Sequence, residues 1–194
     1  MKAAQAMKAR STHSEIILAG SGGQGLILSG IMLAEAAMLE GKNVAQTQSY
    51  GIASRGGLSL AEVIVDEDEI IFQQVRTPDC ILALTEEAAK KYESWAAKGV
   101  PMLYDSTLAA GRNDPNFIGR EFTRIASDLG NVASVNILAL ATVAAYSEVV
   151  RLTSLERLVR KRFRGAALDL NLKLLALGGE LARAENAACS HTGA

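Results

Sequence analysis

The first of two glycine-rich segments in this sequence has residue types and spacing suited to anion binding. Gly20-Ser21-Gly22-Gly23-Gln24-Gly25 fits the pattern Gly-x-Gly-x-x-Gly between an apolar run and a helical pattern. Glycines there allow a tight turn, and N–H groups at the start of a helix attract anions. We therefore predict that this loop binds a phosphate, with a purely structural turn as the alternative. Its candidate binding residues are Ser21, Gly22, Gly23, Gln24 and Gly25.

The second glycine-rich segment runs from Ser49 to Gly57 and contains an arginine. Arg55, set among small residues and glycines, is suited to hold a phosphate or carboxylate through two parallel hydrogen bonds. The alternative is an arginine that ties down carbonyl groups of its own loop. Tyr50 could stack on a base or pack against the protein. The candidate binding residues here are Ser49, Tyr50, Gly51, Arg55, Gly56 and Gly57.

A nicotinamide dinucleotide makes a further demand that this sequence does not meet. Such folds place an Asp or Glu about 20 residues after the glycines, at the end of the second strand. The chain has Gln46-Thr47-Gln48-Ser49 there, and the nearest carboxylate, Glu40, lies at the end of the preceding helical pattern. A stand-alone NAD(P)-binding oxidoreductase is therefore a disfavoured alternative.

Residues for catalysis or metal binding are sparse. Both histidines, His13 and His191, lie in the tails, and the two cysteines, Cys80 and Cys189, are far apart with no CxxC pattern. We predict no catalytic residue and no metal site on this chain. The unpaired cysteines are typical of the reducing cytoplasm. A net charge of −1 and the lack of an apolar run of about 20 residues argue against nucleic acid and a membrane span.

The remaining sequence predicts alternating strands and helices. We expect strands over 15–20, 44–48, 58–65, 80–84 and 100–104, an edge strand over 122–126, and helices over 26–40, 86–97, 134–150, 154–163 and 167–177. This order predicts an α/β fold with a doubly wound, mostly parallel, Rossmann-like sheet and a helical C-terminal third. We expect one domain over 15–185, between a disordered leader at 1–14 and a frayed tail at 186–194.

Three local features of this fold can be predicted in more detail. The first strand, helix and second strand form a βαβ unit, which places both glycine-rich loops at the carboxyl edge of the sheet. The helix over 26–40 presents apolar positions 27, 31, 34 and 38 on one face. The acidic cluster 66–69 is expected to be a solvated hairpin tip before Ile70-Ile71-Phe72.

Together the two loops resemble the gamma domain of 2-oxoacid:ferredoxin oxidoreductases. The motifs that carry the resemblance are Gly22-Gly23-Gln24-Gly25, Gln48-Ser49-Tyr50-Gly51 and Arg55-Gly56-Gly57, with Arg76-Thr77-Pro78-Asp79 and the turn at 131–136. The stretch 45–51 is especially similar to 2-oxoglutarate-type gamma subunits. The resemblance covers about residues 15 to 180. The chain departs from it at Ile52-Ala53-Ser54, where many relatives have Pro-Glu-Ala.

The resemblance implies a subunit that is not catalytic alone. Such complexes decarboxylate a 2-oxoacid on thiamine diphosphate with Mg, pass electrons through [4Fe–4S] clusters to ferredoxin or another acceptor, and form an acyl-coenzyme A. Those cofactors belong to alpha, beta and delta partner subunits, while the gamma domain contributes to the coenzyme A site. Candidate substrates are 2-oxoglutarate, phenylglyoxylate and indolepyruvate. A purely architectural subunit is the remaining alternative.

Overall fold

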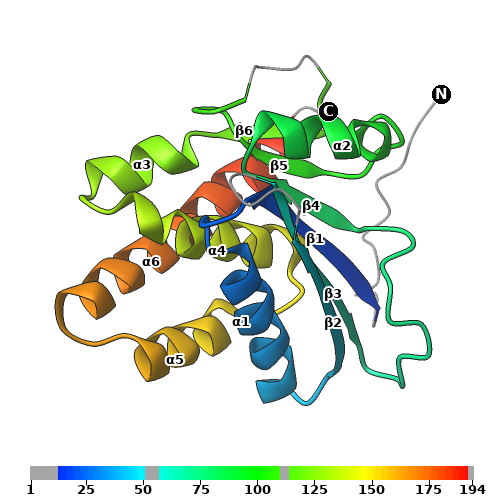
Figure 1. Cartoon of the computed structure of the whole chain (residues 1–194), viewed down its shortest axis with the longest axis horizontal. Helices are drawn as coiled ribbons and strands as arrows, with labels where there is room; N and C mark the ends of the chain where they lie inside the picture. The colour runs from blue at the N-terminus through cyan, green and yellow to red at the C-terminus, as the bar shows by residue number, and fades with distance from the viewer. Residues whose placement is uncertain (1–12, 51–56, 110–113, 192–194) are drawn as a thin grey trace.

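The computed structural model describes residues 13–50, 57–109 and 114–191, with the backbone alone for Tyr50 and 186–191. Its centre is a six-stranded sheet in the order β2-β3-β1-β4-β5-β6. The strands are β1 (Ser14–Ser21), β2 (Asn43–Tyr50), β3 (Leu58–Asp66), β4 (Cys80–Ala83), β5 (Met102–Asp105) and β6 (Phe117–Arg120). Figure 1 shows the sheet with helices packed against it.

The sheet is mostly parallel, as the sequence predicts. β1, β4, β5 and β6 pair in parallel, and only β3 runs the other way, antiparallel to both β1 and β2. The predicted βαβ unit is therefore split: β1 and β2 share a direction, but β3 is inserted between them. Sequence spacing alone could not reveal this, because the third strand returns into the gap only when the sheet forms.

Helices cover the two faces of the sheet unequally. They are α1 (Leu26–Leu39), α2 (Glu86–Ala96), α3 (Phe122–Asp128), α4 (Val135–Ser147), α5 (Leu152–Arg162) and α6 (Gly165–His191), with a short 3-10 turn η1 (Val132–Ser134). The core that contains α1, α3, α4, α5 and α6 lies on one face, and α2 packs on the other. The helical C-terminal third thus thickens one side of the molecule (Figure 1).

Strand β1 shows how the sequence fills both cores. Side chains alternate across a strand, so Ile16 and Leu18 enter the core of the larger helical layer, while Ile17 and Ala19 enter the core under α2. All four are buried. Each large apolar side chain buried in this way contributes roughly 1.5–3 kcal/mol. A continuous apolar run therefore marks a strand that is covered on both sides.

The predicted apolar face of α1 is wrong. Met38 is 65% exposed, whereas the buried face includes Ser29, Gly30 and Leu33. The helix carries apolar residues nearly all round, so periodicity alone did not select the packed side. Close approach did: a Cβ on Gly30 would lie 2.8 Å from Cβ of Ala61 on β3.

The edge-strand and hairpin predictions are also wrong. Residues 122–126 form α3, whose first turn is fixed because Asp105 Oδ2 accepts a 3.0 Å hydrogen bond from Thr123 N; the edge strand is β6, which pairs with β5. Ile70-Ile71-Phe72 is not a strand, so the acidic cluster at 66–69 begins a long connection rather than a hairpin.

The predicted end of the last helix at 177 is wrong as well. α6 continues through Gly178 and Gly179 to His191. Gly178 serves contact between helices: a Cβ there would lie 2.6 Å from both Leu138 O and Ala141 Cβ of α4. A glycine that lets two helices touch looks the same in sequence as a glycine that ends one.

Candidate functional site

The first glycine-rich loop joins β1 to α1. Gly25 is the N-cap residue of α1 at φ 73°, and it has no side chain with which to cap the first turn of this helix. Gly23 also has a positive φ, 89°. An L-residue rarely adopts this backbone conformation, so these two positions require glycine for the turn itself.

The four glycines of this loop divide into two packed and two open positions. A Cβ on Gly20 would lie 2.4 Å from Gln24 Oε1, and one on Gly25 would lie 2.6 Å from Asn136 Nδ2. At Gly22 and Gly23 a Cβ would meet nothing within 4 Å, and both residues are exposed. The inner glycines fit the loop against the protein, and the outer pair leaves its surface clear.

Gln24, a predicted binding residue, has its side chain engaged inside the protein. Its Oε1 accepts a 2.7 Å hydrogen bond from Ser21 N, and its Nε2 donates a 3.2 Å hydrogen bond to Leu84 O. The side chain thereby fixes the loop to the end of β4. In this arrangement the Gln24 side chain helps to set the shape of the loop.

Asn136 on α4 supports the loop from behind, and the sequence did not single it out for this role. It is 5% exposed, and its Nδ2 donates to Gly25 O at 3.4 Å. Ser29 Oγ lies 3.3 Å from Gly25 O and 3.4 Å from Asn136 O, so it can donate to either acceptor. The only signal was the resemblance at 131–136, which gave no role to any one side chain.

The described ends of the second loop lie directly beside the first. Gly22 N donates a long hydrogen bond, 3.4 Å, to Gly57 O. In the ladders next to it, Ser21 pairs with Leu58 and Ser59 pairs with Tyr50. Ser49 is exposed at the same edge. The structure therefore brings together the two segments as predicted, while Gly51, Arg55 and Gly56 lie outside the described residues.

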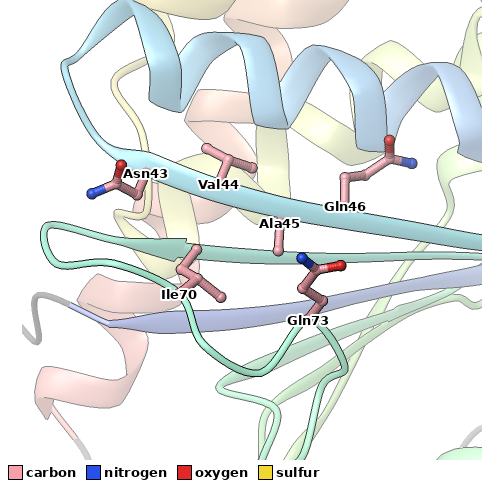
Figure 2. A pocket seen from close by; sticks show the side chains of 6 residues that line it. All are labelled: Asn43, Val44, Ala45, Gln46, Ile70 and Gln73. Carbon is pink, nitrogen blue, oxygen red and sulfur yellow. The ribbon is translucent and has the colours of Figure 1, made fainter.

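A cavity of about 360 Å³ lies elsewhere, at the other end of β2. It is lined by Asn43, Val44, Ala45, Gln46, Ile70 and Gln73. Figure 2 shows Ile70 and Gln73 reaching it from the connection after β3. Asn43 pairs with Asp66, at the opposite end of the ladder from Tyr50. The cavity is therefore separate from the described ends of the glycine-rich loops.

Comparison with known proteins identifies the family. Residues 15–181 match the model of the pyruvate ferredoxin/flavodoxin oxidoreductase family. The chain belongs to this family. It is also 38% identical over 169 residues to the 2-oxoglutarate synthase subunit KorC of Archaeoglobus fulgidus, and the match covers 87% of each chain.

Solved structures place the chain with the gamma subunits of this family. The gamma subunit of the keto/oxoacid ferredoxin oxidoreductase of Geobacter sulfurreducens is similar over 88% of this chain and 99% of its own, with 36% identity and a TM-score of 0.76. A 2-oxoglutarate:ferredoxin oxidoreductase from Magnetococcus marinus shares the fold at 22% identity and a TM-score of 0.80. That match covers 89% of this chain but 31% of the other.

Two further polar groups have structural roles in this family member. Asp105 is fully buried, and its carboxylate accepts hydrogen bonds from Thr107 N and from Thr123 N and Oγ1. On the basic helix α5, Arg162 donates to Glu35 at 2.7 Å, and this hydrogen bond lowers the pKa of Glu35. Both groups hold secondary-structure elements together.

Glu40, the acidic residue nearest to the position at which dinucleotide-binding folds hold the ribose, also has a structural role. Burial by itself would raise the pKa of Glu40, but hydrogen bonds from Ser154 Oγ at 2.7 Å and Arg151 N at 2.8 Å outweigh it, so the pKa is lowered. This carboxylate joins the end of α1 to the start of α5. These hydrogen bonds hold the Glu40 carboxylate at α5, and not at the glycine-rich loops.

Metal-binding groups do not gather in the described part of the family member. Among residues 13–50, 57–109 and 114–191, no three His, Cys, Asp or Glu side chains are placed to share a metal ion. Cys80 is fully buried, and this burial raises its pKa to about 12, as expected of a small core residue. None of the helices in these ranges is both long and apolar enough to cross a membrane.

Proposed function

We propose that this chain, as the gamma subunit of a 2-oxoacid:ferredoxin oxidoreductase complex, holds phosphate groups of coenzyme A on its first glycine-rich loop. The observation that carries the proposal is the open backbone at Gly22 and Gly23, next to the uncapped first turn of α1. Backbone N–H groups at a helix start carry a partial positive charge of about +0.5. A phosphate could approach them without meeting a side chain.

The second loop would supply the remaining contacts. Ser49, Tyr50 and Gly57 border the same edge through the ladder and the hydrogen bond described above. We propose that Gly51, Arg55 and Gly56 complete the site, with Arg55 donating two parallel guanidinium N–H hydrogen bonds to a phosphate. Tyr50 is proposed to stack on the adenine ring.

A solved relative supports coenzyme A as the ligand. The 2-oxoglutarate:ferredoxin oxidoreductase from Magnetococcus marinus was determined with 2-oxoglutarate, coenzyme A and succinyl-CoA bound. It shares this fold as part of a longer chain. The 2-oxoglutarate synthase subunit KorC relative favours the same substrate. We therefore propose 2-oxoglutarate as the 2-oxoacid, with phenylglyoxylate and indolepyruvate as the substrates to compare with it.

The redox chemistry is assigned to partner chains. The described residues hold no candidate metal cluster, and the polar groups around the glycine-rich loops are engaged in loop structure. We propose that alpha, beta and delta subunits carry thiamine diphosphate, Mg and the [4Fe–4S] clusters in the cytoplasm, with ferredoxin as acceptor. This chain would then be inactive alone. Its purification from the native source should bring the partner subunits with it, and an active isolated chain would contradict the assignment.

Placing a negative charge at Gly22 tests the site. Gly22→Asp in the assembled complex should raise the KM for coenzyme A on the order of tenfold, about 1.4 kcal/mol, because the carboxylate repels the bound phosphate. Gly22→Asn is the matched control: it has nearly the same shape without the charge, and neither side chain meets an atom within 4 Å at its Cβ. The KM for the 2-oxoacid should not change.

The two outcomes of this experiment separate the functions. An equal KM for coenzyme A in the Asp and Asn variants would reject phosphate binding at this loop. If assembly of the complex fails while coenzyme A affinity persists, the loop is architectural.

Arg55→Ala should raise the KM for coenzyme A and leave decarboxylation intact, and an unchanged KM would remove Arg55 from the site.

A further inference from the structure

The outer edge of β2 lacks the features that normally protect an edge strand. All eight of its residues pair in unbroken register with β3 on one side, and the strand contains neither charge nor proline. It ends the described sheet, so nothing there pairs with its other side. Such a strand presents a row of free N–H and C=O groups to any second strand.

The opposite edge of the sheet follows the usual protective rule. β6 has four residues, including Gly119 and Arg120. The Arg120 side chain forms an ion pair with Glu185 of α6. A short strand with a charge and a glycine is a poor template for pairing. The two edges of the described sheet therefore differ: β6 has features that hinder pairing with a further strand, and β2 does not.

The charged side chains nearby do not lie along the β2 edge, although Ile70 and Gln73 line a cavity with its first four residues, 43–46. Lys42, the charge just before the strand, is directed to Val149 O, with a hydrogen bond of 2.6 Å. Thr47 donates to Glu62 of β3 at 3.0 Å, along the sheet and inward. Gln48 and Ser49 are exposed. A strand that approaches this edge would meet neutral amide and hydroxyl groups.

The residues of β2 are arranged nearly symmetrically about Thr47. On either side lie Gln46 and Gln48, then the small residues Ala45 and Ser49, then the larger Val44 and Tyr50. When two copies of one strand pair antiparallel about a twofold axis, residues equidistant from the axis lie opposite each other. With Thr47 on the axis, glutamine would face glutamine, and each small residue would face a small one.

We propose that two copies of this chain pair through their β2 strands, antiparallel about a twofold axis at Thr47. Val44 and Gln46 lie on the α1 side of the strand and Ala45 on the other (Figure 2). The pairing keeps each residue opposite one of the same side. A foreign strand would explain the open edge but not its symmetry.

A cysteine on the proposed axis gives a direct test. Thr47→Cys in a Cys189→Ser background of the full chain places two thiols on residues that face each other, with Cβ atoms about 5 Å apart. Cys80 is fully buried, with its pKa raised to about 12, and will not compete. Under mild oxidation this variant should form a disulfide-linked dimer of twice the 20.5 kDa chain mass.

Ser49→Cys in the same background is the matched control. It is on the same face of the strand and is more exposed, but its copies would lie four residues apart along the pairing, about 14 Å. It should form at least tenfold less linked dimer at equal concentration. Light scattering on the unmodified chain should show the doubled mass without any cross-link.

Several results would overturn the proposal. They are a monomeric mass for the unmodified chain at 100 μM or so, equal cross-linking at positions 47 and 49, or cross-linking of Thr47→Cys to a different subunit. The Thr47→Cys disulfide must also form in the assembled complex, and a link found only in the isolated chain counts against the proposal. None of these readouts measures coenzyme A binding, although Ser49 belongs to the second glycine-rich segment, because each one reports only the mass or the cross-linking of the chain.

Discussion

The two ends of β1 differ in how closely other residues surround the backbone. At the carboxyl end, the chain turns through Gly22 and Gly23 with open space around both residues. At the amino end, the carboxylate of Glu15 lies 7% exposed and accepts N–H groups from Arg76 and Thr77, at 2.6 and 2.7 Å. Ser21 N and Gly22 N at the carboxyl end also have internal acceptors, Gln24 Oε1 and Gly57 O, so the two ends differ in the space around the backbone.

The amino end is closed by a network of acidic side chains. Asp79 Oδ2 accepts a hydrogen bond from Glu15 N at 3.0 Å. His13 lies 2.6 Å from Asp66 and 3.1 Å from Glu15, so it links the start of β1 to the end of β3. Buried N–H groups without a partner cost about 1–3 kcal/mol each. The comparison teaches that the same strand anchors the fold at one end and leaves open space around Gly22 and Gly23 at the other.

The largest expected effect on stability comes from replacing a packed glycine of the loop that follows β1. Gly25→Val should destabilise the protein by about 2–5 kcal/mol, because a left-handed valine costs about 1–2 kcal/mol and overpacking against Asn136 adds about 1–3 kcal/mol. Urea denaturation measures the loss. Gly22→Ala, at an open position, should stay within about 0.5 kcal/mol; similar losses for both variants would remove the distinction between packed and open glycines.

Removing the Glu15 carboxylate at the amino end of β1 should give the next largest effect on stability. Glu15→Ala leaves the N–H groups of Arg76 and Thr77 without their acceptor, so we expect a loss of about 2–3 kcal/mol in the free energy of unfolding. Glu69→Ala, at an exposed glutamate, is the control and should change stability little. If both variants lose the same amount, the network at the amino end does not anchor β1.

A smaller effect is expected from replacing Gln24, whose side chain attaches the loop after β1 to the end of β4. Gln24→Met removes the hydrogen bonds to Ser21 N and Leu84 O while keeping the side-chain length, so it should cost about 1–2 kcal/mol. It should also raise the KM for coenzyme A in the complex, because the loop loses its attachment to β4. Gln74→Met, at an exposed site, controls for the change of residue type. Unaltered stability would show that Gln24 does not hold the loop.

The smallest effect is a pH dependence at the closed end. The hydrogen bond to Asp66 is the main reason that the pKa of His13 is raised above 6.5. Stability from this group is therefore fully present below pH 6.5 and is lost as the pH rises through the folded-state pKa. The His13 side chain is 45% exposed, so solvent screening keeps the loss below about 1 kcal/mol. Denaturation from pH 5.5 to 9 should show this slope, and His13→Gln should abolish it; an equal slope in the variant would assign the dependence to another group.

Much of the fold could be predicted because buried strands and capped helices leave local signals. The run 15–20 became β1 and Thr85 became the cap of α2, with Oγ1 accepting from Ala88 N at 3.2 Å. The segment that begins at Phe122 was predicted wrongly as a strand, because a short apolar segment with one aromatic residue fits a strand and a helix equally well. Its helix depends on Asp105, a capping group 17 positions earlier in the chain.

The candidate site divides in the same way. The sequence alone determined that two glycine-rich loops follow β1 and β2 and that no acidic residue follows to hold a ribose, because these facts depend on residue type and spacing. Only the tertiary structure decided that β3 enters between those strands, that Gln24 faces inward, and that Asn136 supports the loop from α4. The physical reason is that a side chain's partner is chosen by packing between distant segments, and local sequence does not encode which of those segments will meet.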